Sequence, residues 1–197
     1  MGRLLLIRHA ESEGNRDQVF TATPYVGLTD RGRRQARAAG EWIRERHAPQ
    51  LAVTSPFTRA RQTADILAAV LGLETIVDED LRERDYGALA GQAYASPRPG
   101  YDRERYWLWR PEGGETLEEV LVRVGAVLDR VAAGTPDGDV VIVSHGAVMM
   151  AAQRHVTASW PPAGRVVRNA GIVVVEHRDG RYDRVYEVPG KEEGPLG

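Results

Sequence analysis

Short apolar runs alternate with segments of helical periodicity along most of this chain, and this order restricts the fold more than any other feature. The runs cover residues 3–7, 51–54, 75–77 and 140–143 and have the character of strands buried on both faces. The segments between them repeat apolar residues at helical spacing, at about 30–46, 56–71 and 117–133. The alternation predicts a three-layer α/β/α fold with a mainly parallel central sheet.

The third helical segment has the clearest boundaries. Thr116 and Glu119 form the pattern of a capping box at its start. A further helix is expected after Gly146. Residues 171–176 and 181–187 then alternate as two strands joined by a turn at 178–180, which we expect to be antiparallel.

Length and local composition predict a single domain over residues 1–188. Residues 91–114 break the alternation with prolines and tryptophans, so we interpret them as a lid or insertion. The polar stretch 189–197 contains glycine and proline and is predicted to be a disordered tail.

Composition limits the classes of partner and chemistry. The chain has no cysteine, which removes disulfides, thiolate metal sites and cysteine nucleophiles. Its net charge of −2 gives no general attraction to nucleic acid or to anionic lipid, so any bound anion needs a local cluster of cations. The apolar run 4–7 ends in Arg8-His9 and fits neither a signal peptide nor a membrane span. We therefore expect a soluble, cytoplasmic protein without nucleic-acid or membrane partners.

Residues suited to an anion follow three of the predicted strands. The first strand ends in Arg8-His9, the second in Ser55-Pro56 with Arg59 one turn later, and the fourth in Ser144-His145-Gly146. Ligands of open α/β sheets bind beyond the carboxyl ends of the strands, so these groups should converge. Any one of these residues alone is more often structural or solvated; the joint pattern favours an anion site.

The second of these strand ends also predicts where its helix begins. Ser55 suits the N-cap and Pro56 the first helical position, so the helix should start directly after the strand. Its unpaired N–H groups and the positive end of its dipole would then face the same anion.

Ordered motifs along the chain resemble those of the histidine phosphatases, or phosphoglycerate mutase-like superfamily. The motifs are Arg8-His9-Ala10-Glu11-Ser12 with Asn15, Ser55-Pro56 with Arg59-Ala60, Leu81-Arg82-Glu83-Arg84-Asp85-Tyr86-Gly87, Gly113-Gly114-Glu115-Thr116, and Ser144-His145-Gly146 with Asn169. The resemblance extends over residues 3 to about 188. Ala10 departs from the family pattern, which usually has glycine there. This change matters only if the backbone needs a positive φ or a very close approach, so we expect activity to survive it.

The resemblance implies a role for each site residue. His9 would attack phosphorus while neutral and form a phosphohistidine, and Glu83 would serve as acid and then base. Arg8, Arg59 and His145 would hold the equatorial oxygens. The resemblance further implies a substrate-binding set without any cofactor or metal: Asn15, Thr21, Tyr86 and Gly146. Without the resemblance, an ion pair of Glu83 with Arg82 or Arg84 would be the simpler interpretation.

Three functions remain open for a small phosphorylated substrate. The favoured one is a phosphomonoester phosphatase; the others are a cofactor-dependent phosphoglycerate mutase and a non-catalytic module that binds a phosphorylated ligand. Two cations of the mutases are missing: Tyr94 stands where a mutase has a lysine, and Arg110-Pro111 stands where it has a pair of arginines. Basic residues of the insertion could substitute for them: Arg98, Arg103 and Arg105. A metal site on His9 and His145 lacks the usual zinc spacing, and a homodimer is left open.

Overall fold

The computed structural model describes residues 1–21 and 23–188, so the predicted tail 189–197 lies outside the described residues. Its core is a six-stranded sheet in the order β3-β2-β4-β1-β5-β6. β1 to β4 pair in parallel, and β5 and β6 are antiparallel, as predicted for the later strands. The strands are β1 Gly2–Arg8, β2 Pro49–Thr54, β3 Thr75–Val77, β4 Asp139–Ser144, β5 Ile172–Arg178 and β6 Arg181–Val188.

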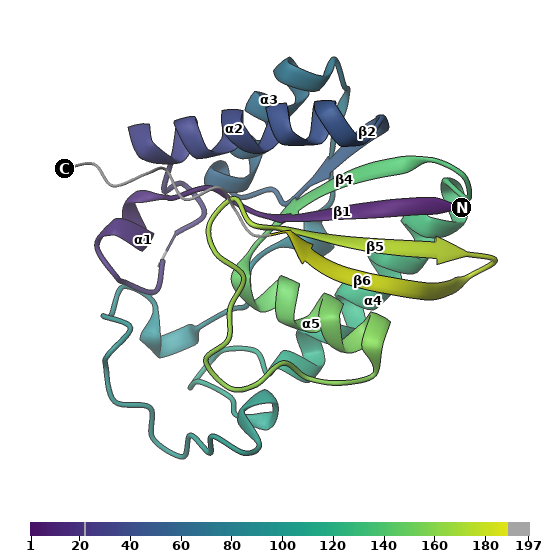
Figure 1. Ribbon diagram of the computed structural model, residues 1–197. Helices are drawn as coiled ribbons and strands as arrows, with labels where there is room; N and C mark the ends of the chain where they lie inside the picture. Colours follow the sequence, from purple (N-terminus) through teal and green to yellow (C-terminus); the bar gives the residue numbers. More distant parts are fainter. Residues whose placement is uncertain (22, 189–197) are drawn as a thin grey trace.

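Helices cover both faces of this sheet. α2 and α3 lie on one face, and α4 and α5 lie on the other, which confirms the three-layer α/β/α class (Figure 1). The α-helices are α1 Glu13–Arg16, α2 Asp30–Arg46, α3 Thr58–Leu71, α4 Leu117–Gly134 and α5 Gly146–Thr157, with short 3₁₀ turns at Glu79–Leu81, Gly87–Leu89 and Tyr106–Leu108. Within the described ranges, no helix combines the length and the apolar character needed to cross a membrane.

The central strands are apolar throughout because both of their faces are buried. In β1, Leu4 and Leu6 pack on the α4–α5 side, whereas Leu5 and Ile7 pack on the α2–α3 side. Each of these side chains is almost fully buried, and such burial contributes roughly 1.5–3 kcal/mol per residue. The two apolar layers therefore hold β1, and the residues that follow it, in a fixed position.

Two local predictions were wrong, each because of a tertiary contact. α3 begins at Thr58 and has Phe57 as its N-cap, whereas Ser55 is hydrogen-bonded to His145 of the neighbouring strand end and does not cap the helix. β3 is not buried on both faces, since Ile76 and Val77 are 52% and 45% exposed at the edge of the sheet. By contrast, the predicted capping box of Thr116 and Glu119 at the start of α4 is confirmed.

The segment 91–114 forms one short 3₁₀ turn and otherwise runs as an irregular loop beside the carboxyl ends of the parallel strands (Figure 1). Its first arm is hydrogen-bonded to Phe20, far earlier in the chain: Gly91 N donates to the carbonyl of Phe20, and Phe20 N donates to that of Gln92. Its far arm is held by Tyr106, whose hydroxyl donates to the carbonyl of Pro161 at 2.5 Å. The segment is thus tied to the molecule at both ends.

Candidate active site

A cavity of about 400 Å³ opens at the carboxyl ends of β1, β2 and β4. All predicted site residues except His145 line it: Arg8, His9, Asn15, Thr21, Arg59, Glu83, Tyr86 and Gly146. His145 lies behind His9, fully buried, with 5.1 Å between the two ring centroids. The structure therefore brings together residues from across the sequence at the rim where they were expected.

His9 is held as a neutral imidazole whose Nε2 carries the lone pair. Its side chain is 2% exposed, and Nδ1 lies 2.8 Å from the carbonyl oxygen of Ala10, to which it donates. This hydrogen bond leaves the lone pair on Nε2, which accepts from Nε of Arg59 at 3.2 Å. Burial, and then the charges of Arg59 and Arg8, lower the pKa of His9 well below its ordinary value of 6.5.

Three buried nitrogen atoms near His9 have no hydrogen-bond partner among the described residues. They are Arg8 Nε, Arg59 Nη1 and His145 Nδ1. A buried unpaired donor typically costs about 1–3 kcal/mol, so three at one place indicate a ligand that supplies acceptors. The planar donor array of guanidinium matches the oxygens of a phosphate.

His145 contacts the hydroxyl of Ser55 through one ring nitrogen. Ser55 Oγ accepts from Phe57 N at 3.3 Å and lies 2.7 Å from Nε2 of His145. When the serine hydroxyl donates to Nε2, Nδ1 of His145 carries the ring hydrogen, and this is the tautomer that an oxygen of a phosphoryl group requires. Burial, followed by the charge of Arg59, lowers the pKa of His145 well below its ordinary value.

The carboxylate of Glu83 is fixed through one of its oxygens. Oε1 accepts from the backbone N–H of Arg84 at 2.9 Å and from that of Ala147 at 3.2 Å, in the first turn of α5. In the described part of the chain, no hydrogen bond engages Oε2. The ion pair considered from the sequence is absent among the described residues, since Arg82 pairs with Asp80 and Glu115, and Arg84 donates to backbone carbonyls.

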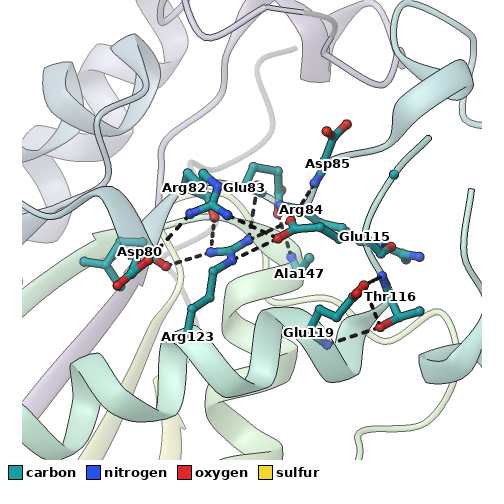
Figure 2. Close-up of polar contacts among 12 residues, drawn as sticks. Asp80, Arg82, Glu83, Arg84, Asp85, Glu115, Thr116, Glu119, Arg123 and Ala147 are labelled. Atoms are coloured by element: carbon teal, nitrogen blue, oxygen red, sulfur yellow. Dashed lines mark hydrogen bonds and ion pairs between the residues drawn. The ribbon is translucent and has the colours of Figure 1, made fainter.

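Arg123 of α4 holds the loop that carries Glu83 (Figure 2). Its Nη1 donates to the carbonyls of Asp80 and Arg82 at 2.6 and 2.8 Å, and its Nη2 donates to that of Glu83 at 3.3 Å. The same guanidinium pairs with the carboxylate of Glu115 at 3.0 Å. Sequence reasoning missed Arg123 because a single arginine on an amphipathic helix usually lies in solvent.

Asn169 is a second residue that the predicted site did not include. Its Nδ2 donates to the carbonyl of His9 at 3.0 Å and to Oδ1 of Asn15 at 2.9 Å. Asn15 in turn donates to the hydroxyl of Tyr94 at 3.2 Å. The position of Asn169 in the last sequence motif was the available signal for its place at the site. The chain of amides links the backbone of His9 to the segment 91–114.

Six aromatic side chains line the part of the cavity that we call its outer half: Phe20, Tyr86, Tyr94, Tyr101, Tyr106 and Trp109. Tyr86 packs against Phe20 with 4.6 Å between ring centroids, and Phe20 also contacts the ring of Tyr94 at 5.0 Å. Burial raises the pKa of Tyr86 above its ordinary value, so its hydroxyl stays protonated. A Cβ added to Gly146 would lie 3.1 Å from Cγ1 of Val166, another lining residue, so glycine lets the start of α5 approach Val166 closely.

Ala10 and the metal-site interpretation can also be compared with the geometry. Ala10 is buried, and its backbone is not in the left-handed region, so this position does not need glycine for its φ angle. Among the residues that the structure describes, no group of three or more His, Asp or Glu side chains is arranged to hold a metal ion.

Residues 4–186 match the family model of the histidine phosphatase superfamily (branch 1). The chain belongs to this superfamily. A 2,3-bisphosphoglycerate-dependent phosphoglycerate mutase of Parvibaculum lavamentivorans is 36% identical over 158 residues, or 73% of this chain and 74% of the mutase. A bifunctional protein of Mycobacterium tuberculosis is 36% identical over 148 residues, which are 73% of this chain. The chain covers only 41% of the length of that relative.

Solved structures of the superfamily share the fold over nearly the whole chain. A mycobacterial glucosyl-3-phosphoglycerate phosphatase, solved with VO3, has a TM-score of 0.82 and 28% identity, and the match covers 94% of this chain and 96% of that one. A phosphoserine phosphatase of Entamoeba histolytica has a TM-score of 0.85 at 21% identity, covering 97% of this chain and 98% of that one. Superfamily and fold are thus shown, whereas neighbours and relatives include both phosphatases and mutases.

Proposed function

We propose that this protein is a phosphatase that hydrolyses phosphomonoesters through a phosphohistidine on His9. One observation carries the proposal: Nε2 of a neutral, buried histidine keeps its lone pair beside three cationic or N–H donors that have no partner among the described residues, with a carboxylate at the same cavity. The donors suit the oxygens of a phosphoryl group, and Nε2 suits attack on its phosphorus.

In the first step, Nε2 of His9 forms a bond to phosphorus while the bond from phosphorus to the ester oxygen breaks. Glu83 supplies the proton that the leaving oxygen needs. In the second step, Glu83 takes a proton from water as the water oxygen attacks phosphorus. The P–N bond breaks, inorganic phosphate leaves, and both His9 and Glu83 return to their starting states.

Arg8, Arg59 and His145 hold the three equatorial oxygens in this mechanism, where charge is carried through the transition state. Asn15 and Thr21, which line the same cavity, add neutral donors. Glu83 acts through Oε2, because Oε1 is engaged by two backbone N–H groups. The side chains of this cavity provide the positive charge, so the mechanism calls for no metal ion.

The mutase alternative is supported by the names of several relatives, including the enzyme of Parvibaculum lavamentivorans. The contacts of Arg110 count against it. Arg110 donates to the carbonyl of Gly114 and to the carboxylate of Glu119 at 2.6 Å, and it is not among the residues that line the cavity. Tyr94, which does line the cavity, offers a hydroxyl where a mutase would need a cation. The proposal therefore stays with hydrolysis.

A module that only binds a phosphorylated ligand is the third candidate. A carboxylate at the phosphoryl end of the cavity would repel such a ligand and has no use in binding alone. Glu83 therefore favours an enzyme. A cytoplasmic location and a single domain over residues 1–188 complete the proposal.

The decisive assay follows the fate of the phosphoryl group. The purified protein is given a panel of phosphomonoesters, and separately 3-phosphoglycerate with 2,3-bisphosphoglycerate. We expect inorganic phosphate from the panel, at a rate well above that of 2-phosphoglycerate formation. Fast isomerisation with little phosphate release would establish the mutase, and an absence of turnover with retained phosphate binding would establish the binding module.

A further inference from the structure

The outer half of the cavity contains a cation that the proposed chemistry does not use. Arg98 lines the cavity, whereas Arg103 and Arg105 of the same segment are exposed and do not. Of the three arginines that could substitute for missing mutase cations, only Arg98 is therefore in place to meet a substrate. In the described part of the chain, no carboxylate forms an ion pair with it.

Arg98 is held in a defined orientation. Its Nη2 donates to the carbonyl of Tyr94 at 2.8 Å. Its guanidinium carbon lies 5.3 Å from the ring centroid of Phe20 and 5.4 Å from that of Tyr101. Stacking on two rings removes part of the water around the charge and leaves the remaining N–H donors for another partner.

Arg84 provides a contrast within the same cavity. It also lies over aromatic rings, those of Tyr86 and Trp109, but its Nε and Nη2 donate to backbone carbonyls at 2.7 and 2.6 Å. Arg84 therefore holds the walls together. The charge of Arg98 contributes to a lowered pKa of Arg84, after burial as the main cause, so the two cations are close enough to repel each other.

The charge around the cavity is unbalanced. Its described lining contains four arginines and one acidic residue, Glu83. Arg8 and Arg59 are assigned to the transferred phosphoryl group, and Arg84 is engaged by the backbone. Arg98 remains as the arginine of this group with N–H donors to spare, and one guanidinium within an aromatic surround suits a single bidentate acceptor such as a carboxylate.

Arg98 is also linked to the phosphoryl end. Tyr94 carries the carbonyl that accepts from Arg98, and its hydroxyl accepts from Asn15. Tyr94 thus contacts both Arg98 and Asn15. Asn15 accepts from Asn169, which also donates to the carbonyl of His9. A ligand in this cavity of about 400 Å³ can therefore place its phosphoryl group at His9 and a second group toward Arg98.

We propose that Arg98 forms a second anion subsite, which selects phosphomonoesters whose leaving group carries a carboxylate beside an apolar or ring-shaped body. The proposal rests on the proposed function, because it takes the phosphoryl end of the cavity as the place of the transferred group. The aromatic side chains of Phe20, Tyr94 and Tyr101 contact the body of the leaving group, and Arg98 contacts its carboxylate.

The test compares two ligands that differ by one charge: 4-carboxyphenyl phosphate and its neutral carboxamide analogue. Binding is measured by calorimetry to the full-length His9→Ala protein, which cannot turn the ligands over by the proposed route. We expect the carboxylate to bind about tenfold more tightly than the amide, as for a charge-assisted hydrogen bond. Arg98→Gln should remove this preference, and Arg98→Lys should retain part of it.

Arg103→Gln is the matched control, because it removes the same charge from an exposed position of the same segment. It should keep the full preference. Equal binding of the two ligands in the parent, or equal preference in the Arg98→Gln and Arg103→Gln proteins, would overturn the subsite. Failure of the proposed function would look different, since the unmodified enzyme would then release no phosphate from either ligand while the binding preference persisted.

Discussion

The two buried histidines of the candidate site, His9 and His145, should make the stability of the fold depend on pH. Burial lowers the pKa of both in the folded protein, so below about pH 6.5 the unfolded chain binds protons that the folded protein does not. Falling pH therefore favours the unfolded state. The free energy of unfolding should decrease below pH 6.5 by up to about 1.4 kcal/mol per pH unit for each histidine.

Urea unfolding at pH 7.5, 6.5 and 5.5 measures this slope. His145→Gln removes one of the two groups, so its slope should be smaller by about one proton. An unchanged slope in that variant would mean that His145 titrates in the folded protein as it does in the unfolded chain.

Glu83 should matter most when the leaving group is a poor one. An alkoxide needs a proton as it departs, whereas a nitrophenolate hardly does, so Glu83→Gln should slow single-turnover cleavage of an alkyl phosphate by about 100-fold or more. Phosphorylation of His9 by p-nitrophenyl phosphate should change far less. Removal of Arg59 is the control. Because Arg59 would contact the transferred phosphoryl group, its removal should slow the cleavage of both substrates alike. Equal losses in Glu83→Gln would exclude Glu83 as the acid.

At the residue scale, the sequence predicted the groups that lie next to strand ends and missed those that reach the site from elsewhere. His9, Arg59 and Glu83 belong to contiguous motifs. Asn169 and Arg123 act through carbonyls of the loops they hold, at 3.0 Å for His9 and 3.3 Å for Glu83. Contacts to backbone carbonyls leave no mark in the pattern of residue types, so the roles of both residues needed the structure, although the position of Asn169 in the last motif was a signal for that residue.

The start of α2 positions the loop that follows His9, and Gly32 permits the contact. A Cβ on Gly32 would lie 2.1 Å from the carbonyl oxygen of Glu11, two residues after His9. Gly32→Ala should therefore destabilise the protein, by about 1–3 kcal/mol, although alanine is the better helix former. Gly134 of α4 is the control, since a Cβ there meets nothing within 4 Å.

Gly134→Ala should instead be neutral or stabilise by up to about 1 kcal/mol. Chemical denaturation of both variants, beside a phosphatase assay, separates the two effects. Equal changes in stability would show that the contact between α2 and the loop relaxes without cost.

At the element scale, local signals succeeded where they acted alone. The boundaries of α2 and the capping box of α4 agree with the structure. The start of α3 was wrong because a second strand end competes for Ser55, and no local rule includes that competitor. β3 was taken as buried because three apolar or β-branched residues look the same at the edge of a sheet as in its centre.

At the scale of the whole molecule, the sequence predicted the fold but not the course of the irregular segment 91–114. The alternation of strands and helices predicted the layers correctly, because strands and helices each have their own period of apolar residues. The course of residues 91–114 depends on aromatic contacts with distant segments, such as the stacking of Trp107 on Trp160 at 6.1 Å between centroids. A lid role for this segment and the homodimer remain predictions.

Independence from metal ions is a prediction about the complete molecule. Because two arginines and His145 would carry the charge of the phosphoryl group, phosphatase activity should persist in excess EDTA. Vanadate, which mimics five-coordinate phosphorus and accompanies the related mycobacterial phosphatase in its solved structure, should inhibit the protein. Loss of activity on chelation, restored by a divalent ion, would favour a metal-dependent hydrolase.

The most direct measurement is to trap the phosphoenzyme on His9. Rapid quenching with ³²P-labelled substrate should yield one acid-labile, alkali-stable phosphoryl group per chain, located at residue 9 by peptide mapping. His9→Ala should remove both the label and the turnover while leaving the fold intact. His155→Ala, which changes a histidine bonded to Asp129 away from the cavity, should keep both. Turnover by His9→Ala near that of the unmodified protein, or label on another residue, would contradict the phosphohistidine mechanism.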